Sequence, residues 1–169
     1  MSHVEATAAG APDRPAREVR EYLHTVPAPP ALVFPLLCPV RERDWVDGWD
    51  ARLVHTASGR AEDHCVFVTR PDDRGASTWV VTRHEPPTAI GFAIFVPDPG
   101  YVERLDVTVT PIAAGSQLRW RRTYTALHAA GTAALAAIAG PGLDARMARL
   151  EQALRHYCAT GTCLRSAVC

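Results

Sequence analysis

Residues 102–127 read VERLDVTVTPIAAGSQLRWRRTYTAL and predict a β-hairpin. On both sides of the turn segment AAGS, residues 113–116, large apolar side chains recur at every second position. This period of two is typical of strands that bury one face. A turn at this point places Val107 opposite Trp120. The buried face of the hairpin is predicted to carry Leu105, Val107, Val109, Leu118, Trp120 and Tyr124.

The chain before this hairpin shows the same period of two. Residues 18–26 form a first expected strand, which Pro27 ends. The turn EPPT, residues 85–88, places Trp79 and Phe92 on one face of another hairpin. Short turns between consecutive strands predict an antiparallel meander. Its other strands are expected at residues 51–56, 64–69, 77–83 and 89–96.

Helical signals lie on either side of the meander. Two short helices are expected at residues 31–37 and 40–49, each preceded by a proline that suits a first helical turn. A longer helix is expected at residues 143–160, with Gly161 as its C-cap. Its apolar face carries Leu143, Met147, Leu150, Leu154 and Tyr157, whereas Arg146, Arg149, Glu151 and Arg155 fall mostly on other faces.

These elements predict an α+β domain. A seven-stranded antiparallel sheet wraps around the long C-terminal helix, and two short helices follow the first strand. The sheet has an apolar face that must be covered, and the final helix is the one large amphipathic element available for this. A strongly twisted sheet around one helix seldom fills completely, so we expect a pocket between them.

The composition fits one globular domain of 169 residues. All 18 basic residues are arginine and balance 18 acidic residues, so no surface for nucleic acid is predicted. The absence of lysine excludes Schiff-base, P-loop and protein-kinase chemistry. We expect a disordered leader at residues 1–17, the domain at residues 18–161 and a C-terminal tail at residues 162–169.

Two further features concern the setting of the protein. The longest apolar run, around residues 129–140, is shorter than the ~20 residues of a membrane helix, so no membrane span is predicted. An odd number of cysteines in a chain with an ordinary core favours free thiols in a reduced, cytoplasmic protein. The five cysteines are Cys38, Cys65, Cys158, Cys163 and Cys169.

Residues 33–49 read VFPLLCPVRERDWVDGW and resemble a bacterial family of the SRPBCC superfamily with the signature Cys-Pro-x-Arg-Glu-Arg-x-Trp-x-x-Gly-Trp. The runs CVFVTR and MARLEQALRHYCATG fit the same family, and the resemblance spans about residues 18–161. It implies the helix-grip fold of START-like domains, aromatic polyketide cyclases and plant allergen-type ligand carriers. Because the superfamily hosts carriers, cyclases, dehydratases and chaperone activators, the fold alone does not decide the function.

The expected pocket lies on the face shared by the hairpins and the long helix. Arg122 and Glu103 both fall on this otherwise apolar face, where an unpaired charge is costly. Either they pair with each other, or Arg122 contacts an anionic or carbonyl group of a ligand. The aromatic residues either line the pocket or pack as core. The predicted ligand-binding residues are Trp45, Trp49, Trp79, Phe92, Trp120, Arg122, Tyr124 and Met147.

The segment of residues 40–49 is expected at one end of the pocket. Trp45 and Trp49 are four residues apart and share a face of the expected helix, either as a cap on the pocket or as a structural plug. Glu42 is either a carboxylate at the pocket mouth or the partner of a nearby arginine, and we favour the salt bridge.

No catalytic motif stands out in the sequence. The acid–base candidates are Tyr124 and His128, four residues apart and on one face of a strand, together with Glu42. The dipeptide His84-Glu85 precedes two prolines and is therefore not the helical zinc motif H-E-x-x-H. No metal site and no cofactor is predicted.

Three functions remain open. The first is binding of a small hydrophobic or aromatic molecule between sheet and helix. The second is an enzyme of the polyketide cyclase/dehydratase type, in which a polar pair deep in the pocket moves a proton. The third is a protein-interaction module of the chaperone-activator type. The expected partner is a small hydrophobic molecule and not nucleic acid, and a homodimer is left open.

Overall fold

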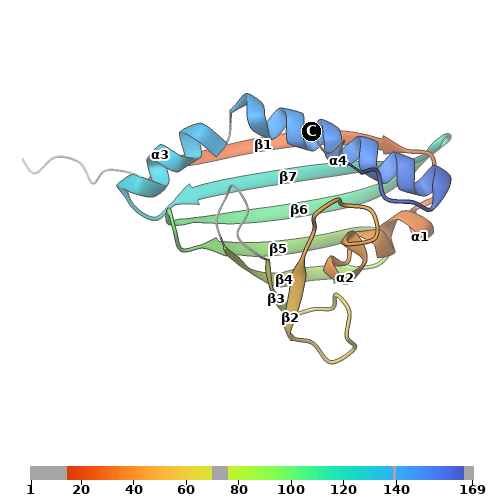
Figure 1. Ribbon diagram of the computed structural model, residues 1–169, viewed down its shortest axis with the longest axis horizontal. Helices are drawn as coiled ribbons and strands as arrows, with labels where there is room; N and C mark the ends of the chain where they lie inside the picture. Colours follow the sequence, from red (N-terminus) through yellow and green to blue (C-terminus); the bar gives the residue numbers. More distant parts are fainter. Residues whose placement is uncertain (1–14, 70–75, 139, 166–169) are drawn as a thin grey trace, which may run out of the picture.

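The computed structural model describes residues 15–69, 76–138 and 140–165. Its centre is a seven-stranded antiparallel sheet in the order β1-β7-β6-β5-β4-β3-β2 (Figure 1). The first strand, β1, is therefore an edge strand and pairs with the last strand, β7. The strands are β1 (Arg17–Val26), β2 (Ala51–His55), β3 (Val66–Thr69), β4 (Ser77–Glu85), β5 (Ala89–Val96), β6 (Tyr101–Ile112) and β7 (Gly115–Ala126).

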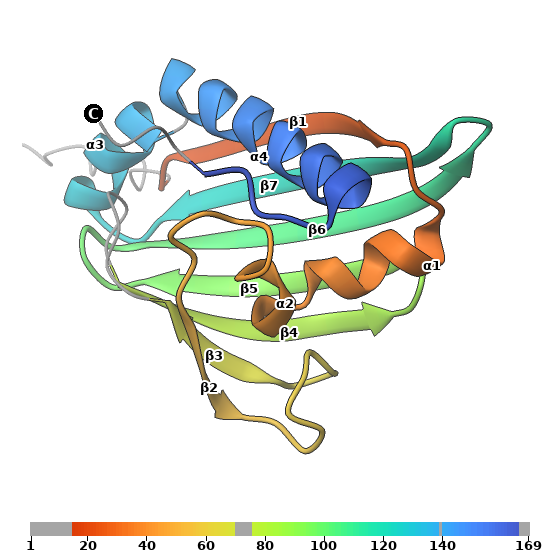
Figure 2. The ribbon, with the colours of Figure 1, turned by 45° about the vertical axis from the view of Figure 1, so that its right-hand side comes forward.

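The helices gather on one side of this sheet. The long helix α4 runs along β1 and β7, whereas the short helices lie over the middle of the sheet (Figure 2). The helices are α1 (Pro30–Val33), the 3-10 helix η1 (Phe34–Leu37), α2 (Pro39–Glu42), α3 (Ala129–Ile138) and α4 (Pro141–Thr160). This arrangement confirms the predicted α+β helix-grip fold.

The predicted hairpin register is confirmed. Val107 lies opposite Trp120, Glu103 lies opposite Tyr124, and β4 pairs with β5 so that Trp79 faces Ile94. Because side chains alternate between the two faces of a strand, these pairings place the bulky residues of β4, β5, β6 and β7 on the inner face, beneath the helices.

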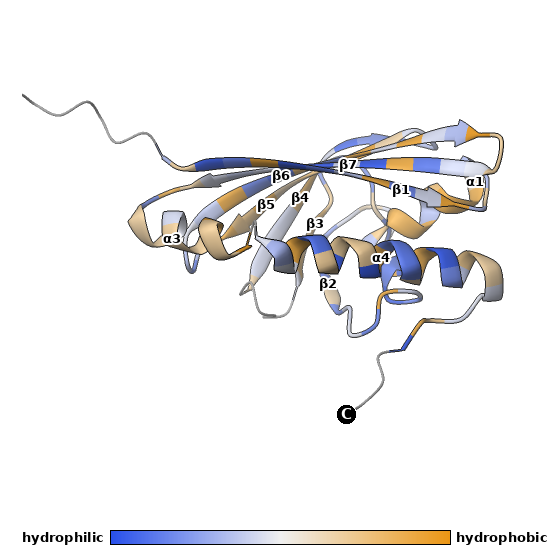
Figure 3. Cartoon of the chain, turned by 90° about the horizontal axis from the view of Figure 1, so that it is seen from above, coloured by the Kyte–Doolittle hydropathy of each residue, from blue (hydrophilic) through white to orange (hydrophobic). Residues whose placement is uncertain are grey.

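Helix α4 follows the predicted pattern of apolar residues. It begins at Pro141 and ends at Thr160. The next residue, Gly161, is the C-cap, and its φ of 69° is the left-handed conformation that favours glycine. Seen from above, α4 forms a separate layer beside the sheet, and its polar and apolar residues alternate along the ribbon (Figure 3). Leu143, Met147 and Leu154 are buried against the sheet.

Three polar contacts fix α4 to the edge strand β1. The hydroxyl of Tyr22 donates to Asp144 at 2.8 Å, and the backbone N–H of Thr25 donates to Glu151 at 2.8 Å. Arg155 donates in turn to the carbonyl of Thr25 at 2.6 Å. The helix is thus held at one edge of the sheet rather than over its centre.

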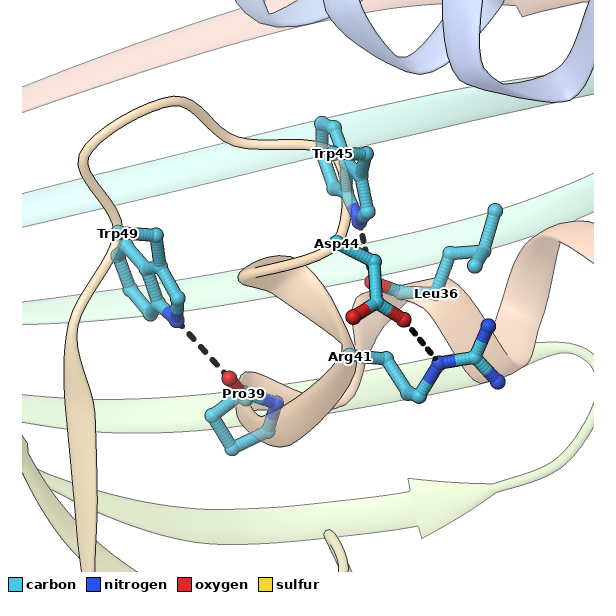
Figure 4. A network of polar contacts seen from close by, with 6 residues as sticks. All are labelled: Leu36, Pro39, Arg41, Asp44, Trp45 and Trp49. Atoms are coloured by element: carbon cyan, nitrogen blue, oxygen red, sulfur yellow. Dashed lines mark hydrogen bonds and ion pairs between the residues drawn. The ribbon is translucent and has the colours of Figure 1, made fainter. Parts of the chain in front are cut away.

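The prediction of a helix over residues 40–49 is wrong, because α2 ends at Glu42 and turns follow it. Two indole N–H groups hold the turning chain (Figure 4): Trp45 donates to the carbonyl of Leu36 at 2.8 Å, and Trp49 donates to the carbonyl of Pro39 at 2.9 Å. The two tryptophans therefore do not share a helix face.

Helix α3 was not predicted, since its alanine-rich sequence shows no apolar stripe. It turns the chain between β7 and α4 and buries Leu135 and Gly131. A Cβ on Gly131 would collide with the carbonyl of Gly100, so the absent side chain permits this close packing.

Several expectations fall partly outside the described residues. The four described cysteines are free thiols, whereas Cys169 lies outside the described part of the chain. The same holds for most of the expected leader and for the last four residues of the expected tail. No helix within the described ranges is long and apolar enough to span a membrane.

Replacement of Leu154 by Ala should lower the free energy of unfolding by about 2–5 kcal/mol, because it leaves a cavity under α4. The Leu154 side chain is fully buried, whereas Leu23 on the outer face of β1 is 59% exposed. The matched variant Leu23→Ala should change stability by no more than about 0.5 kcal/mol. Urea unfolding followed by circular dichroism measures both. Equal losses would mean that the buried face of α4 is assigned incorrectly.

Candidate functional site

A cavity of about 440 Å³ lies between the inner face of the sheet and α4. The sheet supplies an apolar wall, α4 supplies a second wall, and the turns after α2 form the third side. The residues that line it are Leu37, Glu42, Val46, Asp47, Gly48, Trp49, Trp79, Phe92, Leu105, Val107, Trp120, Arg122, Arg146, Met147, Arg149, Leu150, Ala153 and Leu164.

Aromatic rings form the wall on the β4–β5 side. Trp79 meets Trp49 edge to face, with ring centres 5.9 Å apart, and Phe92 in the same manner at 5.7 Å. Behind them Phe67 stacks on Trp79 at 5.2 Å. The N–H of Trp79 donates to the hydroxyl of Thr69 at 3.3 Å. These rings support one another in a rigid surface suited to an apolar or aromatic ligand.

At the sheet wall, Arg122 forms a buried ion pair with Glu103. Its Nε lies 2.6 Å from Oε1, and the side chains are only 6% and 3% exposed. A second guanidinium nitrogen lies 3.4 Å from the sulfur of Met147. Burial has the largest single effect and lowers the pKa of the Arg122 guanidinium, but the facing carboxylate of Glu103, together with Tyr124 and Tyr101, raises the pKa overall. Of the two roles left open by the sequence, the structure shows the pair.

Next to this ion pair, Trp120 packs against His24 of β1, with ring centres 5.5 Å apart. Burial lowers the pKa of His24, which favours the neutral imidazole, although the nearby Glu151 carboxylate acts in the opposite direction. The indole N–H of Trp120 and Nδ1 of His24 are buried and have no hydrogen-bond partner among the described residues. The wall beside the cavity thus contains two unsatisfied polar atoms, which are costly in a folded protein.

Four charged residues and one leucine surround the outer end of the cavity. We call these residues the rim: Glu42, Asp47, Arg146, Arg149 and Leu164. The chain after α4 turns back along the helix toward the turns that follow α2 (Figure 2). There Arg165 pairs with Asp47 at 2.8 Å. The start of the expected tail therefore forms part of the rim.

The structure brings most of the predicted ligand-binding residues together. Those that line the cavity are Trp49, Trp79, Phe92, Trp120, Arg122 and Met147, and the candidate carboxylate Glu42 lines it as well. Trp45 is fully buried and is not among the lining residues, which favours the structural plug over the cap on the pocket. Tyr124 is also buried outside the lining and packs against Tyr101 with ring centres 6.1 Å apart.

The predicted pair of Tyr124 and His128 does not meet in the cavity. His128 is exposed beyond the end of β7, where its ring packs against Gly100. The strand ends at Ala126, so the alternation that would keep both residues on one face does not extend to His128. These two residues remain catalytic candidates by residue type only.

Sequence reasoning missed the two arginines of the rim, although it placed Glu42 at the pocket mouth as one alternative. Arg146 and Arg149 were assigned to other faces of the helix, yet both line the cavity beside Met147 and Leu150. Their position next to the apolar stripe, and the length of arginine, were the available signals. Among the described residues there is no group of three or more His, Cys, Asp or Glu side chains that could hold a metal ion.

Replacement of Arg122 by Met should lower the free energy of unfolding by about 3–5 kcal/mol, because Glu103 is left buried without its partner. Adding Glu103→Leu should recover much of this loss. The control is Arg119→Met in the exposed pair with Glu21, where about 1 kcal/mol or less is expected. Denaturant unfolding measures all three variants. A loss at Arg122 no larger than that at Arg119 would contradict the role assigned to the buried pair.

Comparison with solved structures finds the same fold at low sequence identity, which shows the fold alone. The chain is similar to protein MLL2253 from Mesorhizobium loti, with 17% identity, a TM-score of 0.62, and coverage of 82% of this chain and 98% of that one. It is similar to Ara h 8.0201, with 12% identity, a TM-score of 0.60 and coverage of 86% and 99%.

DynU16, a protein from the dynemicin biosynthetic locus, is similar at 19% identity with a TM-score of 0.56. The match covers 89% of this chain and 49% of DynU16, so the chain spans about half of its length. No curated protein matches the sequence. The sequence profile of one family, described as polyketide cyclase / dehydrase and lipid transport, matches residues 6–155. This match confirms the SRPBCC resemblance: the chain belongs to the polyketide cyclase/dehydrase and lipid transport family.

Proposed function

We propose that the protein binds a small hydrophobic or aromatic molecule in the cavity between the sheet and α4. The observation that carries this proposal is the cavity itself, about 440 Å³ in volume and walled by aromatic and aliphatic side chains. Cavities that bind small organic ligands measure about 300–1,000 Å³ and have mostly apolar walls with a few polar groups.

The chemistry of the walls supports an apolar ligand. Trp79, Phe92 and Trp120 offer flat surfaces, and Met147 offers a flexible, polarizable side chain that adapts to different shapes. The one ion pair in the sheet wall is internally neutral, since Glu103 balances Arg122. A polar ligand would find few hydrogen-bonding groups in this part of the cavity.

A second candidate is an enzyme of the cyclase/dehydratase type that uses the same cavity. The observation in its favour is that Glu42, a carboxylate that could transfer a proton, lines a cavity in a member of this family. A general acid or base has to reach the reacting atoms of the bound molecule. Tyr124 and His128 do not line the cavity, so Glu42 is the residue on which this candidate depends.

The proposal includes a reducing, cytoplasmic setting and a small-molecule partner. The four described cysteines are free, and Cys38 and Cys65 are buried in the core. A homodimer is kept as part of the proposal, and sedimentation velocity at several protein concentrations tests it.

The neutral fluorescent probe N-phenyl-1-naphthylamine should bind the protein with a 1:1 stoichiometry and an increase in emission. Replacement of Leu150 by Trp should weaken this binding at least about tenfold, because the larger side chain fills cavity volume. The control is Leu23→Trp, a change of the same size on the exposed outer face of β1. Fluorescence titration gives the dissociation constants. Equal binding by both variants and the wild type would place the probe outside the cavity.

Native mass spectrometry after incubation with lipid and polyketide extracts separates the two candidate functions. A binding protein should retain a compound of unchanged mass. An enzyme should convert the compound, and the conversion should be lost in Glu42→Gln while the compound still binds. Retention of an unchanged compound by both proteins would rule out the enzyme for the compounds in the extract.

A further inference from the structure

We infer that the ligand carries an acidic group, and that Arg149 on the rim binds this group while the apolar body of the ligand occupies the cavity. This inference rests on the proposed function and names the chemical class of its ligand. It differs from the expectation for Arg122, which already has a carboxylate partner.

The residues that line the cavity carry more positive than negative charge. Three arginines line it, Arg122, Arg146 and Arg149, against the two carboxylates Glu42 and Asp47. One lining arginine and one lining carboxylate are neutralised by partners, since Glu103 pairs with Arg122 and Arg165 pairs with Asp47. Leaving both out of the count does not change the excess of one positive charge. Counted over these residues, Glu42 stands against two rim arginines, and one positive charge is in excess.

Arg149 lies on the rim of the cavity. The residue is exposed, yet its side chain lines the cavity, next to Leu150 and two residues after Met147. No hydrogen bond or ion pair joins it to another described residue, in contrast to Arg122 and Arg165. The guanidinium of arginine presents paired N–H donors that fit carboxylate, sulfonate or phosphate groups. Arg149 is thus a cation available at the rim.

The difference between the apolar sheet wall and the charged rim sets the orientation of the ligand. The sheet wall contains aromatic rings and a closed ion pair, and it offers no excess positive charge to an anion. Transfer of an anion to that end would be costly, whereas an anion at the rim keeps contact with water. An amphiphilic acid therefore enters with its apolar body first and leaves its acidic group beside α4.

Two probes with the same anilinonaphthalene body test this inference. N-phenyl-1-naphthylamine is neutral, and 8-anilinonaphthalene-1-sulfonate adds one sulfonate. The wild type should bind the sulfonate about three- to tenfold more tightly than the neutral probe, as expected for an exposed charge-assisted contact. Arg149→Ala should abolish this preference, because it removes the contact with the sulfonate. Arg149→Lys should retain part of it, and the preference should fall as ionic strength rises.

The control variant is Arg121→Ala, which removes the same charge from an exposed position on the outer face of β7. It should keep the full preference, and thermal unfolding of each variant confirms that it is folded. Neutral-probe binding with an unchanged sulfonate preference in Arg149→Ala would overturn the role of Arg149 and leave the proposed function in place. Failure of the wild type to bind either probe would overturn the proposed function, and this inference with it.

Discussion

The inner face of the sheet is much wider than α4, the one long helix that packs on it. Six spacings of about 4.8 Å make a seven-stranded sheet roughly 29 Å wide, whereas an α-helix with its side chains is about 10–12 Å wide. Tyr22, Thr25 and their partners hold α4 at the β1 edge. The segment from α1 to α2 covers another part of the face (Figure 2). The cavity is the space that the two covers leave between them.

The register of the β6–β7 hairpin explains how this fold holds two charged side chains inside the core. Glu103 on β6 pairs with Tyr124 on β7, two residues away from Arg122. Glu103 and Arg122 are therefore diagonal neighbours across the hairpin, and the sheet register alone brings them into contact. Because the two charges neutralise each other, the pair adds no net charge to the sheet wall. The other charged residues that line the cavity lie on the rim, where water screens them. Position in the fold thus separates Arg122, which serves the structure, from Arg149, for which we propose a role in binding.

Much of this arrangement could be predicted because it depends on short-range periodicity. The turn at residues 113–116 fixed the partners of Trp120 and Arg122, and the spacing of Leu143, Met147 and Leu154 fixed the buried face of α4. The turns after α2 could not be predicted in this way, since they depend on bonds from Trp45 and Trp49 to carbonyls nine and ten residues earlier. Arg146 and Arg149 were missed because periodicity gives the direction of a side chain and not the reach of an arginine.

The contact of Arg165 with Asp47 closes the rim of the cavity by a weak interaction only. The Arg165 side chain is 74% exposed, and exposed ion pairs contribute at most about 1 kcal/mol. Leu164, which lines the cavity, is only half-buried. A ligand of the proposed kind could therefore enter and leave past residues 164–165 without separation of α4 from β1.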